Sequence, residues 1–104
     1  MKNRYDIIPS QLLDSAVDLM TLGIHEFAWA QKSIDAILEI LSENKKAVLG
    51  GDVYRIVDGT LVQTLDSWYV KSGTNYLDSY TFTQNFIQDY EAKNRGDYVF
   101  SLIF

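Results

Sequence analysis

The feature that most constrains the fold is a pair of adjacent glycines inside an apolar, β-type run that leads into a turn. Residues 48–57 read Val-Leu-Gly-Gly-Asp-Val-Tyr-Arg-Ile-Val, and Asp58 and Gly59 follow directly. Asp-Gly is typical of a tight two-residue hairpin turn, because both central positions of that turn need positive φ. We therefore predict a hairpin with strands near residues 47–57 and 60–69 as the centre of the fold.

The register of this hairpin depends on the two glycines. A two-residue turn without a bulge places Gly51 opposite Asp66, whereas a bulge at Gly50 and Gly51 shifts the pairing by one residue and brings them near Ser67 and Trp68. Glycine inside a strand usually marks a bulge or the close approach of another backbone or ring. In either register the missing side chains leave room for a large group. We expect the Trp68 indole to fill this space.

Asp52 follows the glycines, and three roles are open for it. A bulge exposes backbone N–H groups, and Asp52 could accept hydrogen bonds from them, which would lower its pKa and add stability that is lost in acid. Asp52 and Asp66 could instead meet across the hairpin as an acid–base pair or a divalent-ion site. As an exposed carboxylate, Asp52 could bind an arginine of a partner. We expect the structural role for Gly50, Gly51 and Asp52, because no third metal ligand has recognisable spacing.

Apolar residues at helical spacing predict three helices. Pro9 and Ser10 open the first, and Gly23 stops it. The second runs from about residue 30 to 43. The third runs from about residue 79 to 94, with Asp78 or Ser79 as its cap.

Residues 98–104 form a strongly β-type run, so the predicted element order is α-α-β-β-α-β. The simplest architecture for this order is a two-layer α+β fold, in which three helices pack on one face of a three-stranded, mainly antiparallel sheet. A chain of 104 residues can bury one core, and we expect a single domain over residues 1–104.

Charge and composition narrow the range of partners. The net charge is −5: seven acidic against three basic residues in 1–44, three against four in 45–77, and four against two in 78–104. An acidic surface repels phosphate backbones, so we expect no nucleic-acid binding. Such a surface suits a basic protein partner, since opposite fields accelerate encounter.

Other function classes find little support. The chain has no cysteine, so it has neither disulfides nor thiolate metal sites, and its one histidine, His25, excludes a triad of imidazole ligands. The Gly50-Gly51 pair lacks the spacing and lysine of a phosphate loop. No apolar run approaches the ~20 residues that span a bilayer, and the charged N-terminus does not resemble a signal peptide. We expect a cytoplasmic protein with no catalytic residue, cofactor, metal or membrane contact.

Aromatic residues are candidates for both core and interface. We expect Trp29 to be structural. Trp68 and Tyr69 are neighbours on a strand and must point to opposite faces, so one is buried and the other lies on the uncovered face or the rim. Exposed tyrosine and tryptophan anchor many interfaces. Tyr54, Asp66, Trp68 and Tyr69 are therefore our candidate partner-binding residues.

Several motifs resemble the bacterial immunity protein 40 family. They are Leu-Gly-Gly-Asp-Val-Tyr at 49–54, Asp-Ser-Trp-Tyr at 66–69, Phe-Ala-Trp at 27–29, Phe-Ile-Gln-Asp-Tyr at 86–90, and an aromatic final strand. Together they cover nearly all of the chain from Gly23 onward. The sequence departs from the family pattern at Ser67, where asparagine is usual, and at Phe86, where tyrosine is common.

The resemblance implies an antidote protein of a bacterial polymorphic-toxin or contact-inhibition system. Such a protein is not an enzyme; it binds and blocks a toxin domain that is encoded nearby. We expect it to be a monomer or weak homodimer in isolation. Two alternatives stay open: a general interaction or regulatory module, and a carboxylate-dependent hydrolase that uses Asp52 and Asp66.

Overall fold

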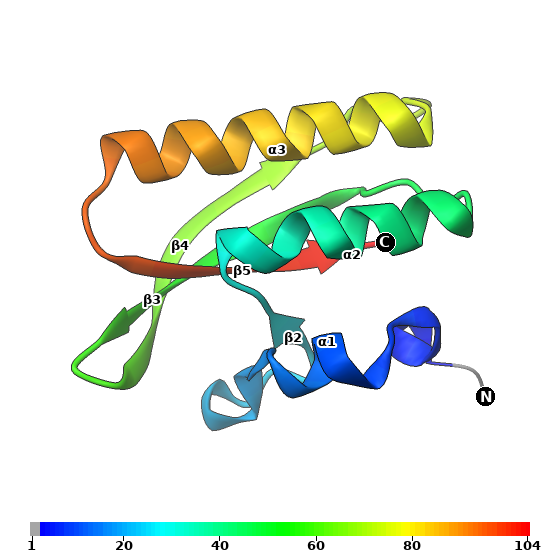
Figure 1. Cartoon of the computed structure of the whole chain (residues 1–104). Coiled ribbons are helices and arrows are strands. Elements are labelled where there is room, and N and C mark those ends of the chain that lie inside the picture. The colour runs from blue at the N-terminus through cyan, green and yellow to red at the C-terminus, as the bar shows by residue number, and fades with distance from the viewer. Residues whose placement is uncertain (1–2) are drawn as a thin grey trace.

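An antiparallel three-stranded sheet forms the centre of the computed structural model, which describes residues 3–104. Strand β3 (Gly50–Val57) lies between β4 (Thr60–Tyr69) and β5 (Asp97–Ile103), as Figure 1 shows. The predicted hairpin, the antiparallel third strand and the α+β class are thereby confirmed.

The helices α2 (Gln31–Glu43) and α3 (Tyr76–Lys93) lie on the same face of this sheet, which we call the helix face. The apolar stripe of α2 is buried there, because its spacing places every member on one side of the helix. Strands and helices share one core, whose most deeply buried members include Trp29, Ile34, Ile37, Leu41, Val53, Trp68, Ile87, Phe100 and Leu102. The second predicted helix and the final strand are therefore confirmed.

The third helix begins earlier than predicted. Asn75 is its cap, since the Asn75 side-chain oxygen accepts a hydrogen bond from the Asp78 backbone N–H at 2.9 Å. Ser79 is buried within the helix instead. Its hydroxyl donates to the Tyr76 carbonyl at 2.7 Å and accepts from the Val48 N–H at 3.0 Å. The predicted cap at Asp78 or Ser79 is therefore wrong. The Ser79 hydroxyl lies inside the helix and bonds to Val48, which is distant in the sequence.

The first predicted helix is wrong beyond its first turns. After η1 (Arg4–Ile7), the helix α1 spans only Ser10–Asp14. The chain then forms β1 (Val17–Asp18), the 3-10 helix η2 (Leu19–Leu22) and β2 (Phe27–Ala28), and β1 pairs antiparallel with β2. We call residues 17–28 the hook.

Two local features explain why the helix stops. The Asp18 carboxylate accepts from the Met20 N–H at 3.0 Å and so caps a new helical turn. The apolar residues that suggested one helix also divide between two cores: Leu13 and Ala16 contact the core of the helix face, whereas Val17 and Leu22 contact a second core. Gly23 ends η2 with φ 74°, as expected of a glycine at a helix end.

The hook covers part of the sheet face opposite the helices, which we call the hook face. Its core consists of Leu19, Ala28, Tyr54 and Val99. Next to the hook, Trp29 pairs with Phe100 of β5 through two backbone hydrogen bonds of 2.9 and 2.8 Å. The predicted uncovered face is therefore only partly open. Within residues 3–104, no helix is long and apolar enough to cross a membrane.

Candidate functional site

A bulge in β4, rather than at the glycines, shapes the site. The turn at Asp58 and Gly59 has φ values of 51° and 76°, and regular pairing runs from it to Tyr54 and Gln63. The next pairs are Asp52 with Ser67 and Gly51 with Trp68. Residues 64–66 of β4 therefore stand opposite Val53 alone. The predicted approach of the glycines to Trp68 is confirmed, but the bulge lies in the other strand and is larger than predicted.

Thr64 satisfies the backbone at this bulge. Its hydroxyl donates to the Val53 carbonyl at 2.8 Å and accepts from the Asp66 N–H at 3.0 Å. No such bond reaches the Asp52 carboxylate among the described residues, so the predicted role for Asp52 is wrong. Leu65 lies between Thr64 and Asp66, and it has φ 67° and an 88% exposed side chain. A bulky side chain in this backbone conformation is uncommon.

Gly51 lies against the Trp68 indole, as predicted. A Cβ atom at Gly51 would overlap both the indole and the Ser101 carbonyl. Trp68 is 3% exposed, stacks on Phe86 with 4.8 Å between ring centroids, and donates through Nε1 to the Thr83 hydroxyl at 3.3 Å. Tyr69 is 80% exposed. Of these two neighbours, only Tyr69 is thus available to a partner in this structure.

Trp29 lies in the core. It is completely buried, and its Nε1 donates to the Leu12 carbonyl at 2.8 Å. This contact ties α1 to the junction between the hook and α2.

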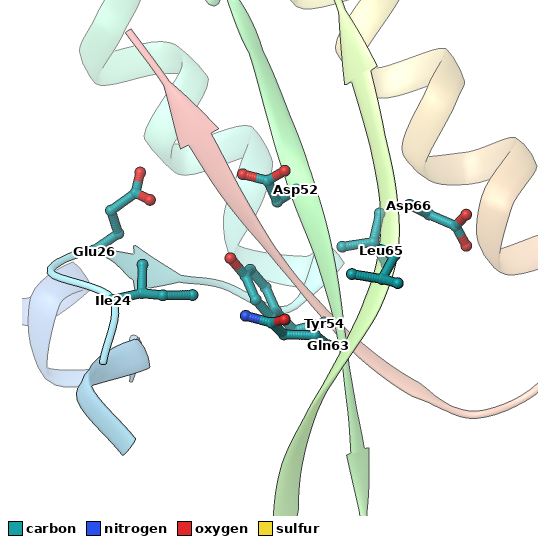
Figure 2. A pocket seen from close by; sticks show the side chains of 8 residues that line it. Ile24, Glu26, Asp52, Tyr54, Gln63, Leu65 and Asp66 are labelled. Atoms are coloured by element: carbon teal, nitrogen blue, oxygen red, sulfur yellow. The ribbon is translucent and has the colours of Figure 1, made fainter. Parts of the chain in front are cut away.

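An open hollow of about 350 Å³ lies on the hook face, between the hook and the bulge. Figure 2 shows the side chains of Glu26 from the hook, Asp52 and Tyr54 from β3, and Leu65 from β4 around it. Its other lining residues are Ile24, Val53, Gln63 and Asp66. Tyr54 is only 5% exposed and forms part of its floor.

The structure does not join Asp52 and Asp66 into a pair. Their carboxylates point in opposite directions in Figure 2, with Asp52 toward the hook side and Asp66 toward α3. Asp66 accepts a hydrogen bond from the Tyr90 hydroxyl at 2.8 Å, and burial together with this bond raises the pKa of Tyr90 to about 12. In the part of the chain that the structure describes, no three His, Asp or Glu side chains are grouped to hold a metal ion.

The electrostatics of the hollow contradict a second expectation for Asp52. Burial, and then the negative charge of Glu26, raise the pKa of Asp52 above its ordinary value of 3.8. The predicted lowering is wrong because, within residues 3–104, no N–H donor or cation compensates the carboxylate. Glu26 is itself paired with Arg4, whose Nη2 lies 2.6 Å from Oε1. Burial, and then Asp52 and Glu26, raise the pKa of Tyr54 as well.

Sequence reasoning missed Glu26, Gln63 and Leu65 as members of the site. Glu26 lines the hollow only because the hook folds back over the sheet. No local sequence pattern predicts that fold. Leu65 lies between two polar residues of a strand, so its exposure follows from the bulge rather than from alternation. Residues 52, 54 and 66 come from motifs that the sequence did single out.

Comparison with known proteins found one protein family that matches this chain. The sequence profile described as immunity protein 40 matches residues 18–104, from the hook through β5, and so includes every residue that lines the hollow. No curated protein and no solved structure matches the chain. On the strength of the profile match, the chain belongs to the immunity protein 40 family.

Proposed function

We propose that this chain is an immunity protein that binds a toxin domain encoded beside it and blocks the activity of that domain. The observation that carries this proposal is the family match, which spans the hook, the sheet and both long helices. In this proposal the protein acts by binding and not by catalysis, and it works in the cytoplasm.

The surface around β4 supports a binding role. Val62, Leu65 and Tyr69 are large apolar or aromatic side chains that this strand leaves exposed. Interfaces use such side chains as anchors, with polar groups around them. We assign the partner contact to the surface that carries Leu65, Asp66 and Tyr69. Trp68 supports this surface from the core below, and Tyr54 lies at the floor of the neighbouring hollow.

Co-expression tests the proposal directly. The toxin domain of the adjacent reading frame is expressed in bacteria with and without this chain, and survival is scored. Protection together with a complex on size-exclusion chromatography is expected. A chain that neither protects nor binds would favour a general interaction module. Stabilisation by divalent metal in a melting experiment, with no protection, would favour the hydrolase alternative.

A further inference from the structure

We propose that the hollow on the hook face binds the guanidinium group of an arginine side chain that a protein partner inserts from its open side. This inference rests on the proposed function for the identity of that partner, a toxin domain, and it names the chemistry of the contact.

The charge of the hollow favours a cation. Its lining residues include Glu26, Asp52 and Asp66 and no lysine or arginine, although the Asp66 carboxylate points away toward α3. Glu26 is neutralised in part by Arg4, which lies within 4.7 Å of the Tyr5 ring centroid. Asp52 forms no ion pair within residues 3–104, so its carboxylate has no compensating positive charge there. Burial, and then the charge of Glu26, raise its pKa. A cationic group beside Asp52 would supply the compensating positive charge.

A second observation is independent of the carboxylates. Ser101 pairs with Asp52 across β3 and β5, so both side chains project from the hook face. The Ser101 hydroxyl is completely buried and, within the described residues, reaches no hydrogen-bond partner of good geometry. It lies close enough to the Tyr54 hydroxyl to favour the ionised form of that group. Ser101 does not itself line the hollow, but its unsatisfied hydroxyl lies beside that of Tyr54, which does. A ligand that donates a hydrogen bond to the Tyr54 oxygen would leave the Tyr54 O–H free to satisfy Ser101.

Arginine fits this site better than lysine. A guanidinium carries five N–H donors in a plane, and it can reach several acceptors at once. The hollow offers the Asp52 carboxylate, the Tyr54 hydroxyl and the Gln63 side chain as acceptors. Tyr54 can accept from the guanidinium and turn its own O–H toward Ser101. The apolar side chains of Ile24 and Leu65 line the same hollow and would cover the methylene stem of an arginine.

The first test uses a small probe and does not require the toxin. Amide NMR spectra of the protein are recorded while Nα-acetyl-arginine amide is added, with the neutral isostere Nα-acetyl-citrulline amide as a control. Saturable shifts at residues 52–54, 26 and 101 are expected with the arginine compound only. Asp52→Asn should abolish them, whereas Glu39→Gln, which removes one charge from an exposed position of α2, should not. Equal shifts with citrulline, or shifts confined to other surfaces, would overturn the inference.

The second test uses the toxin domain of the adjacent reading frame. Asp52→Asn should weaken its binding about tenfold or more, because the partner's charge is then left buried without its counterpart. Glu39→Gln should bind like the wild type, and melting curves confirm that both variants are folded. If the toxin binds and cells are protected, but Asp52→Asn binds as tightly as the wild type, the arginine contact is refuted and the proposed function stands. If the toxin does not bind at all, the proposed function fails, and the arginine titration decides the inference alone.

Discussion

The two faces of the sheet use the same three strands for different purposes. On the helix face, α2 and α3 close over rings such as Trp68 and Phe100, and the packing is continuous. On the hook face, a short segment covers a small core and leaves a hollow lined by carboxylates. The comparison teaches that the pleat of the strands separates core packing from the hollow: the Val53 side chain packs in the core of the helix face, while the Asp52 and Tyr54 side chains face the hollow.

The largest test of this separation compares two neighbours on β4. Trp68→Ala should lower the free energy of unfolding by about 3–5 kcal/mol, because it removes a buried ring from the helix face. Tyr69→Ala should change it by no more than about 0.5 kcal/mol, since that side chain lies in solvent. Urea unfolding followed by circular dichroism measures both. Similar losses from the two variants would show that the faces do not differ as described.

Gly51→Val probes the closest approach on the helix face. The new side chain would overlap the Trp68 indole and the Ser101 carbonyl, so we expect a loss of about 3 kcal/mol or more. Ser67→Val adds a similar side chain at an exposed position of β4 and serves as the control. A soluble Gly51→Val variant with the melting curve of the wild type would contradict the packing of Trp68 against this glycine.

Leu65→Gly sharpens the comparison from the hook face. A left-handed backbone costs an L-residue roughly 1–2 kcal/mol, while glycine loses roughly 0.5–1 kcal/mol through backbone entropy. Leu65→Gly should therefore leave stability unchanged or raise it by up to about 1 kcal/mol, and it should weaken protection against the toxin. Val62→Gly, at an exposed β4 residue without positive φ, should instead destabilise the protein. Equal destabilisation by both changes would show that the backbone of Leu65 is not strained.

Asp52→Asn should have the smallest effect on stability, and its sign is informative. The pKa of Asp52 is raised in the folded protein, so the folded state binds the proton more tightly than the unfolded state and wild-type stability falls as pH rises through that pKa. Glu26 and Tyr54 are the titratable groups that face it. The asparagine variant should be slightly more stable than the wild type at pH 7, and this difference should shrink toward pH 3.8.

Chemical denaturation at the two pH values measures this difference, with Glu39→Gln as the charge-matched control. A variant less stable than the wild type at pH 7 would restore a structural, hydrogen-bonded role for Asp52.

The helix face was predictable because its information is local. The apolar stripe of α2 repeats at the helical period, and the observed helix begins at Gln31, one residue from the predicted start. The turn at Asp58-Gly59 determined the hairpin register as far as Tyr54. Beyond that point the register depends on the Thr64 hydroxyl, which bonds to the backbone of the other strand. Local sequence patterns do not predict a hydrogen bond between two strands.

The hook face was not predictable, because its structure depends on contacts between segments that are distant in the sequence. Within residues 17–28, the pairs 17–18 and 27–28 become strands only by pairing with each other and by contact with the sheet. The apolar spacing of residues 13–20 matches a helix, so the period misled the prediction for the segment before Gly23. Asp52 and Tyr54 were recognised as notable residues, but the sign of the Asp52 pKa shift depends first on burial and then on Glu26, which the hook brings near from a distant part of the sequence.

The bulge at residues 64–66 also affects how copies of this protein meet one another. Strand β5 is bordered by Trp29, but β4 forms the other edge of the three-stranded sheet. A long, flat, largely uncharged edge strand is a template on which further chains can stack into aggregates. The bulge interrupts that edge and increases its local twist, which limits regular pairing to the short stretches on either side. We therefore expect the distortion that exposes Leu65 beside the hollow also to disfavour fibrous self-assembly.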